Sequence, residues 1–551
     1  MNSSLQTRLT KIITEKRFSL AVILVSFVFV IATIVKFMPM KFHSDSAFYV
    51  LLAKEQMASG SMFPPGMCYS TALFVFTPNL IIIPLLLFMK DWILARSVAI
   101  CIVWAFLFFS IYKMFVVKKE SQWLTAAIVC SLIGIPMLGM PGECMDVLFQ
   151  QGGWALLLAV ICAYVGVAHY ILTNRDELEM ILHGTGSKRR VVLLLCGLLL
   201  ITTVPNFGEL RLIPIAVFPF LASFPLLRLL ERSTDARALP KRLYVSVLCT
   251  TVLGIVIAVL VYRTLSALYW PADNQVSLTV DSSTTLTENI GLYIESLYSL
   301  YGEFFPAKLM STAGIVKMIS YLYATLCIVV FPVASLLKFR SFKSSFSRYV
   351  ILFAWICNIL LFALSVPTGA LATTARYLIP TYFFNGVIAA ICVNEIVHTR
   401  PKYEGRALVC AVIAYALITT GFFWKASTPT LESDVKQHQE LVGFLKENDL
   451  EYGYATYWNA YSNTCFANGD VEFVAFASIL GDAVGDPTAI FPWLTNLRWY
   501  DVEYHPGRCF ILLQNGEKID EKWYGRASEK LTVNDFTVLV YDKNINLYEN
   551  A

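Results

Sequence analysis

Charged residues are scarce in this chain of 551 residues: Asp, Glu, Lys and Arg together make up 15% of it. Soluble proteins contain roughly 25%. Hydrophobic residues account for 57% of the chain, and its mean hydropathy is +0.62. This composition excludes a disordered chain and a nucleic-acid binder that depends on a basic patch. It indicates a polytopic membrane protein.

Two short sequence signals are also absent, and a third occurs only once. No G-x-x-x-x-G-K-[ST] segment occurs, which excludes a nucleotide-binding P-loop. The N-x-[ST] pattern occurs once, at Asn2, which favours a bacterial envelope over a eukaryotic secretory lumen. No A-x-A-like site follows the first apolar run, residues 20–38. That run follows a basic N-terminus and is predicted to be a membrane anchor rather than a cleaved signal peptide.

The thirteen cysteines do not form the pattern of a secreted disulfide scaffold, because nine of them lie inside apolar runs. There they are predicted to pack as small hydrophobic residues in the core. Cys465 and Cys509 are the two in the C-terminal part of the sequence. The sequence leaves open whether these two form a disulfide.

Twelve apolar runs are long enough to cross a hydrocarbon core of roughly 30 Å. They lie near residues 20–38, 71–89, 93–116, 122–140, 153–172, 191–206, 212–229, 243–266, 313–337, 349–366, 378–397 and 407–423. The positive-inside rule places the basic loops in the cytoplasm, namely 173–190, 228–242, 338–348 and 398–406. The acidic loop 267–312, the segment 367–377 and the C-terminal part are predicted to lie outside.

The loop 39–70 receives conflicting assignments. Counting spans back from the C-terminal part places it inside, whereas counting forward from the cytoplasmic N-terminus places it outside. The region 63–119 is the predicted source of the conflict, because prolines interrupt its first run and Lys90-Asp91 is a weak boundary. We expect one run there to be re-entrant, interfacial or split in two, which gives 11 or 13 spans, and we place 39–70 outside.

The chain is predicted to divide near residue 425. Residues 1–424 carry a net charge of about +13, whereas residues 425–551 hold ten basic and nineteen acidic residues. In the second part a helix is predicted over 432–448. Strands are predicted at 452–458, 471–476, 509–513 and 536–541. The expected fold is therefore a polytopic α-helical membrane protein with a C-terminal extracytoplasmic α/β domain.

Ionisable residues near the membrane are costly and mark functional sites. The first outer loop contains His43-Ser44-Asp45, followed by apolar residues at helical spacing. An amphipathic helix is predicted along the membrane surface, with Asp45 at its start. Asp45 is either a functional carboxylate or simply the N-cap of that helix.

Three more polar groups lie at predicted outer membrane edges. Glu143 and Asp146 have the i,i+3 spacing that places two carboxylates on one helical face, although a helix start also favours acids. Glu209 and Arg211 are predicted to form an ion pair at a hairpin. Arg376, in Thr373–Pro380, lies at the outer end of a predicted span. A guanidinium at that position suits a phosphate headgroup. The alternative for Arg376 is a contact with ordinary lipid phosphates.

This layout resembles the GT-C superfamily of glycosyltransferases that use polyprenyl-linked sugars, which includes protein O-mannosyltransferases and lipid A aminoarabinose transferases. The resemblance covers residues 15–425 and rests on short motifs: Asp45 with its following helix, Pro64-Pro65, Arg96, and Arg376-Tyr377-Leu378-Ile379-Pro380. In that superfamily an acid of the first outer loop is the catalytic base or a metal ligand. Basic residues of the outer face hold the carrier phosphate.

The site prediction combines these residues with the resemblance. Asp45 is the first catalytic candidate, followed by Glu143 and Asp146. The candidates for binding substrate or phosphate are His43, Arg211, Arg376 and Tyr377. Many relatives carry an adjacent acidic pair where this sequence has Asp45 alone, which leaves open whether Mg²⁺ or Mn²⁺ is a cofactor and Asp45 its ligand.

The predicted reaction moves a sugar from a polyprenyl-phosphate carrier to an extracytoplasmic glycan, lipid or protein. It needs a base for the acceptor hydroxyl and positive charge for the departing phosphate, and direct displacement would invert the anomeric carbon. Aromatic residues of the C-terminal part are candidates for stacking on a glycan or for the core: Trp458, Trp493, Trp499 and Tyr500. A transporter or flippase of lipid-linked sugars and a glycan polymerase or ligase are the alternatives.

Overall fold

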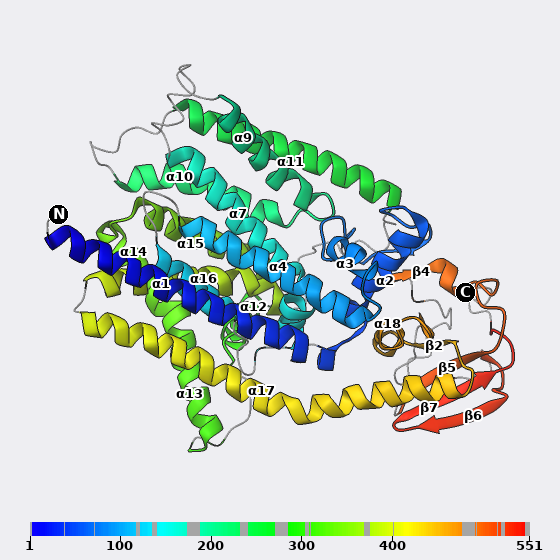
Figure 1. The fold of residues 1–551 in the computed structure, drawn as a ribbon. Helices are drawn as coiled ribbons and strands as arrows, with labels where there is room; N and C mark the ends of the chain where they lie inside the picture. Colours follow the sequence, from blue (N-terminus) through cyan, green and yellow to red (C-terminus); the bar gives the residue numbers. More distant parts are fainter. Residues whose placement is uncertain are drawn as a thin grey trace.

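The chain folds into a bundle of helices and a small mixed β-sheet, joined by one long helix, α17 (Lys402–Glu447) (Figure 1). The computed structural model describes residues 3–37, 39–70, 72–116, 122–134, 140, 142–173, 188–231, 241–269, 285–302, 308, 310–368, 375–399, 402–476, 491, 493–514, 516–519 and 524–545. The first half of the helical part contains α1 (Ser3–Ala32), α2 (Ser44–Ser59), α3 (Asn79–Leu86), α4 (Trp92–Phe115), α5 (Trp123–Gly134), α6 (Gly142–Met145), α7 (Gly153–Thr173) and α9 (Lys188–Thr203). The second half contains α10 (Phe218–Glu231), α11 (Lys241–Tyr269), α12 (Leu286–Ser299), α13 (Thr312–Thr325), α14 (Phe331–Leu337), α15 (Ser345–Ser365) and α16 (Ile379–Thr399).

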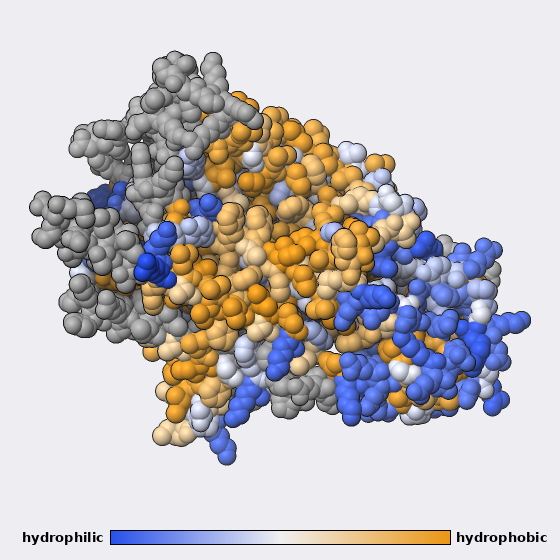
Figure 2. All heavy atoms as spheres, viewed as in Figure 1, coloured by the Kyte–Doolittle hydropathy of each residue, from blue (hydrophilic) through white to orange (hydrophobic). Residues whose placement is uncertain are grey.

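Seven helical segments of the described chain are long and apolar enough to cross a membrane. They are Glu15–Lys36, Trp92–Phe115, Gly153–Leu172, Leu243–Tyr269, Thr312–Leu337, Ser345–Ser365 and Ala375–Thr399. Three shorter apolar helices accompany them: Trp123–Gly134, Val191–Asn206 and Ile213–Leu227. Hydrophobic residues gather over the helical part, and hydrophilic residues gather over the C-terminal sheet (Figure 2). The protein is therefore a multi-pass helical membrane protein with a C-terminal domain that contains a sheet, as the sequence predicts.

The apolar run at 71–89 does not form a spanning helix. Its helical residues are those of α3, which has eight residues, contains Pro84 and packs against α2 and α4. At 1.5 Å per residue, α3 is about 12 Å long and too short to cross a bilayer. Without this run, eleven of the twelve predicted runs remain. The placement of 39–70 on the outer side of the membrane stays a prediction.

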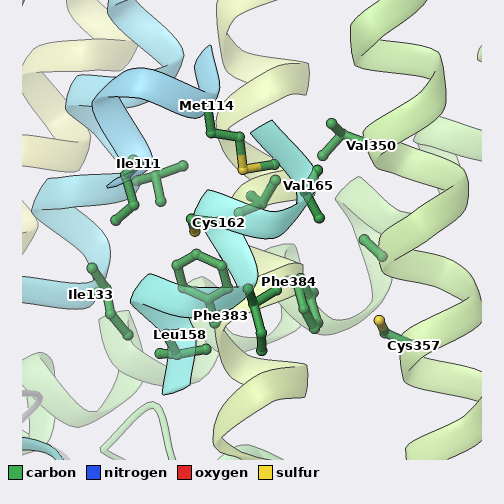
Figure 3. Close-up of a cluster of buried hydrophobic side chains, with 14 of the residues drawn as sticks. Ile111, Met114, Ile133, Leu158, Cys162, Val165, Val350, Cys357, Phe383 and Phe384 are labelled. Carbon is green, nitrogen blue, oxygen red and sulfur yellow. The ribbon is translucent and has the colours of Figure 1, made fainter. Parts of the chain in front are cut away.

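The core of the helical part lies where four long helices meet α5. Figure 3 shows apolar side chains there from α4 (Ile111, Met114), α5 (Ile133), α7 (Leu158, Cys162, Val165), α15 (Val350, Cys357) and α16 (Phe383, Phe384). Cys162 and Cys357 are buried, which agrees with their predicted role as small core residues. Cys196 and Cys249 are instead exposed, because they lie on the outward faces of α9 and α11.

The C-terminal part contains a five-stranded sheet of order β3-β2-β5-β7-β6. Its strands are β2 (Tyr452–Thr456), β3 (Glu472–Phe476), β5 (Cys509–Gln514), β6 (Glu529–Val533) and β7 (Phe536–Tyr541). β2 pairs in parallel with β3 and β5, whereas β7 pairs antiparallel with β5 and β6. The four predicted strands are present. The edge strand β6 is missing from the prediction, because its residues are mostly exposed and its sequence is polar.

Helix α18 (Tyr457–Phe466) connects β2 to β3 and packs against α2. The sequence predicts α2 as a surface helix with one polar face. In the structure most of α2 is buried, and α18 and α3 are among the elements that pack against it. The α/β connection that follows β2 therefore places the C-terminal domain directly on the helix that carries Asp45.

Two further links tie the C-terminal domain to α2. The strand β1 (Met67–Cys68) pairs antiparallel with β4 (Thr495–Asn496). Glu55 of α2 is buried and accepts hydrogen bonds from Asn496 at 2.9 Å, from Arg498 at 3.0 Å and from the indole of Trp499 at 3.2 Å. The Trp499 indole therefore takes part in the contact between the C-terminal domain and α2. Cys465 and Cys509 are both free thiols in the structure.

Candidate active site

A cavity of about 160 Å³ lies where α2, α7 and the C-terminal domain meet. Asp45 and Tyr49 of α2 line one wall, and Trp154 of α7 lines another. Glu209 and Arg211 come from the connection after α9 (Lys188–Thr203), and Arg376 comes from the short helix η10 (Ala375–Leu378) that begins α16. Trp493 closes the cavity from the C-terminal domain. Three predicted residues that are far apart in the sequence, Asp45, Arg211 and Arg376, thus share one cavity.

Asp45 lies in the first turn of α2, but it is not the N-cap of this helix. His43 occupies the N-cap position with extended backbone (φ −137°, ψ 173°), and it makes no side-chain capping hydrogen bond. The Asp45 carboxylate instead accepts a hydrogen bond from the hydroxyl of Tyr457. A carboxylate is favourable in the first turn, where the helix dipole is positive. Because the carboxylate lines the cavity and does not cap the helix, it is placed to act on a substrate.

Tyr457 is a functional candidate that the sequence does not reveal. It begins α18, and its backbone oxygen accepts a hydrogen bond from Ser44, next to Asp45. Burial raises the pKa of Tyr457 far above its ordinary value, and the negative charge of Asp45 raises it further. The hydroxyl therefore stays protonated and donates to the carboxylate. It fixes the orientation of Asp45 from the C-terminal domain.

The charges around the cavity are mixed. Arg211 forms the predicted ion pair with Glu209, with 3.1 Å between Nε and Oε2, and its guanidinium lies 5.7 Å from the centre of the Trp154 ring. Arg376 lies over the ring of Tyr377, 5.7 Å from its centre. Burial is the main cause that raises the pKa of Tyr49, and the negative charges of Glu209 and Asp45 raise it further. The positive charges of Arg211 and Arg376 lower it. Tyr49 and all four charged groups line the same cavity.

Glu143 and Asp146 do not line this cavity, and their side chains contact different segments. The α-helical turn of α6 changes to a π-helical turn, η3 (Asp146–Gln150), at Asp146. Glu143 accepts a hydrogen bond at 2.6 Å from the backbone N–H of Ala375, next to Arg376. Asp146 contacts the His43 ring, with 3.2 Å between Oδ2 and Nε2. The two acids hold the segments that carry Arg376 and Asp45.

Arg96 and Gln150 support the segment that precedes α2. Arg96 lies inside α4 and is fully buried, and its Nη1 donates to Gln150 Oε1 at 2.9 Å. Gln150 is also fully buried, and its amide donates to the backbone oxygen of Lys41. The Arg96 guanidinium also lies 5.1 Å from the centre of the Phe42 ring. The sequence does not predict a role for Gln150, because a single amide inside an apolar segment belongs to no recognisable motif.

The site offers no protein cage for a metal ion. Within the described ranges, no group of three or more His, Cys, Asp or Glu side chains is placed to hold one. Asp45 is engaged with Tyr457, and Glu209 is engaged with Arg211. A metal bound by protein groups alone needs more ligands than these. Mg²⁺ or Mn²⁺ as a cofactor stays a prediction from the resemblance, and no step below depends on it.

Tyr457→Phe is expected to lower the turnover number about tenfold without changing the KM for the donor. The change removes the hydroxyl that orients Asp45, and a hydrogen bond to a charged group typically contributes about 1.5–3 kcal/mol. The phenyl ring keeps its packing against Trp458, at 5.1 Å between ring centres. Steady-state kinetics at a series of donor concentrations test this expectation. An unchanged turnover number would show that Asp45 needs no orientation by Tyr457.

Comparison with known proteins gives limited information. No family model matches the sequence, and no curated protein matches it. The structure is similar to that of ArnT from Cupriavidus metallidurans bound to undecaprenyl phosphate, with 12% identity, a TM-score of 0.47, and 95% of this chain and 97% of that chain covered. For ArnT in the apo state the identity is 13%, the TM-score is 0.46, and the coverage is 90% and 93%. At these values the similarity assigns neither an activity nor site residues to this protein.

Proposed function

We propose that the protein is a membrane glycosyltransferase that moves a sugar from a polyprenyl-phosphate carrier to an extracytoplasmic acceptor. The observation that carries this proposal is the shared cavity of Asp45, Arg211 and Arg376. A carboxylate and guanidinium groups in one cavity supply both a proton acceptor and positive charge for a phosphate. A carrier-linked sugar is already activated, so the reaction needs no nucleotide.

The proposed reaction is a single displacement. Asp45 accepts the proton of the acceptor hydroxyl as its oxygen forms a bond to the anomeric carbon of the sugar. The bond between that carbon and the carrier phosphate breaks on the opposite side, and its electrons leave with the phosphate. Arg376 stabilises the departing charge through donors that suit a phosphate. Attack opposite the leaving group inverts the anomeric carbon.

Arg211 has a secondary role in this proposal. Its charge is offset by Glu209, so that the pair contributes little net charge to the cavity. The pair can still offer guanidinium donors, and Trp154 packs under it. Arg376, whose guanidinium lies over the ring of Tyr377, is our first candidate for the phosphate contact because it lines the cavity together with Asp45. Glu143, Asp146 and His43 position these groups.

A transfer assay with purified protein in detergent tests the proposal. Undecaprenyl phosphate, which is bound in one of the two ArnT structures, is the first carrier to try. The expected result is release of the free carrier phosphate and appearance of the sugar on an acceptor or in water. A transporter or flippase moves its substrate without breaking bonds. Intact donor after incubation under all conditions would therefore favour the transporter and contradict the enzyme.

The proposed orientation places the C-terminal domain outside the cell and the loop before α15 in the cytoplasm. A cysteine introduced at Thr287, in the exposed first turn of α12, should react with a membrane-impermeant thiol reagent added to intact cells. A cysteine at Lys343, which is exposed in the basic loop before α15, should react only after the membrane is opened. The unmodified chain gives the background. The reverse pattern would place the cavity on the cytoplasmic side.

A further inference from the structure

Asp45 and Arg376 line one cavity of about 160 Å³. In the proposed function the donor phosphate lies in this cavity beside Arg376. The acceptor hydroxyl must reach Asp45, so a surface next to Asp45 and outside the cavity is the place to look for binding of the rest of the acceptor.

Trp458 lies at that place. Among the described residues of the C-terminal domain, it is the one large apolar side chain that is more than a third exposed, at 60%. It follows Tyr457, the residue that donates to Asp45, and its ring contacts the His43 ring at 5.9 Å between centres. The aromatic residues named with it in the sequence lie elsewhere: Trp499 and Tyr500 are buried, and Trp493 lines the cavity.

A second cavity lies further along α18. It has a volume of about 390 Å³ and is formed by the segment Pro39–Phe42, α17, α18 and the end of the sheet where β5 finishes at Gln514 and β7 begins at Phe536. Its lining contains polar and aromatic side chains together with the aliphatic Pro39, Met40 and Val435. The polar and aromatic members that the argument uses are Lys41, Phe42, Asp434, Gln437, His438 and Phe466. His438 stacks on Phe466, with 5.2 Å between ring centres and 6° between ring planes.

The second cavity and Trp458 share the same two walls. Phe466 ends α18 and contacts Phe42 edge to face at 5.9 Å, whereas Trp458 near the start of α18 contacts His43. Eight residues of helix separate Trp458 from Phe466, which is about 12 Å along the axis. One elongated ligand could therefore contact both places while its end lies beside Asp45.

We propose that α18 and the segment Pro39–His43 form a glycan-binding face, in which Trp458 stacks on the sugar that carries the reacting hydroxyl and the second cavity holds a more distant sugar. This inference rests on the proposed function and assigns its acceptor to one chemical class. The glycan is either a polysaccharide chain or the head group of a glycolipid, since both present the same pyranose rings.

The lining fits an uncharged polyhydroxylated ligand better than a lipid chain or a peptide. Lys41 and Asp434 bring one charge of each sign, and Gln437 offers both donors and acceptors. A flat aromatic face suits the apolar side of a pyranose ring, whereas an acyl chain needs a continuous apolar patch. Trp458 is instead a single exposed aromatic side chain among the described residues of the C-terminal domain. Hydrophilic residues gather over that domain (Figure 2).

The test uses the full-length protein with tritiated polyprenyl-phosphate sugars prepared from membranes of the source organism. Four acceptor fractions from the same envelope are offered: lipid-free oligosaccharides, glycolipids, phospholipids without sugar, and peptides. We expect label in one or both of the glycan fractions. The free oligosaccharides and the glycolipids distinguish the two sources of the glycan.

Variants connect that transfer to the proposed face. Trp458→Ala should raise the KM for the glycan about tenfold and leave the release of sugar to water unchanged, because donor and Asp45 are untouched. Trp458→Phe should restore most of the transfer. Gln437→Ala should weaken transfer to long oligosaccharides and spare short ones. Phe88→Ala is the matched control, since Phe88 is an aromatic side chain that is 87% exposed outside this face, and it should behave like the parent.

Two results would overturn the glycan-binding face. Label in the peptides or in the sugar-free phospholipids would assign the acceptor to another class. If Trp458→Ala transfers sugar to the glycan as well as the parent does, Trp458 is an ordinary surface or membrane-interface residue. In both cases the proposed glycosyl transfer stands. Intact donor in every fraction, with no release to water by the parent, would instead overturn the proposed function together with this inference.

Discussion

Asp45→Asn is expected to fold, insert and bind donor like the parent protein, whereas its turnover number falls by roughly 10²–10⁴-fold, the usual contribution of a positioned general base. The amide oxygen of Asn can still accept the hydrogen bond from Tyr457, so the local structure is kept. The amide cannot accept a proton from an acceptor hydroxyl. Donor binding and transfer, measured on the same preparation, separate the two effects.

The structure provides a matched control for this variant. Asp91 is the N-cap of α4 and accepts from the backbone N–H of Leu94 at 2.9 Å, outside the cavity. Asn caps a helix about as well as Asp. Asp91→Asn therefore makes the same chemical change at another helix start and should keep the parental turnover. Near-parental transfer by Asp45→Asn would remove Asp45 from catalysis, and Glu209, the other carboxylate that lines the cavity, would become the next candidate.

Arg376→Ala is expected to weaken binding of the polyprenyl-phosphate donor by about 10- to 150-fold, which corresponds to roughly 1.5–3 kcal/mol. The guanidinium offers a phosphate two parallel hydrogen bonds and a permanent charge. Arg376→Lys should restore part of the binding, because the charge is kept and the paired donors are lost. Direct binding of labelled carrier phosphate is the measurement, since it does not depend on the later chemistry.

Arg508→Ala serves as the control, because Arg508 is exposed on the C-terminal domain and lies outside the cavity. Parental donor binding together with parental transfer by both Arg376 variants would mean that Arg376 contacts ordinary lipid headgroups. The phosphate site would then have to be sought at Arg211, the other cavity guanidinium. A loss of transfer with unchanged donor binding would place the role of Arg376 in the transition state alone.

Local sequence patterns predicted the positions of helices and strands better than they predicted which residues pack against them. The strands near Tyr452, Glu472, Cys509 and Phe536 were predictable, because each is a short apolar run between turn residues. The burial of α2 was not predictable. Its polar positions pair with residues far away in the sequence, such as Glu55 with Arg498. No local pattern distinguishes a polar face that meets water from one that meets another domain.

The sequence by itself determined the membrane class, the division into a basic membrane part and an acidic C-terminal part, and the choice of Asp45 and Arg376, because charge and hydropathy are local properties of a chain. Only the tertiary structure decided that these two residues share a cavity, that Glu143 and Asp146 hold other segments, and that Tyr457 contacts Asp45. Such contacts depend on packing between segments hundreds of residues apart. A single sequence carries no signal for that proximity.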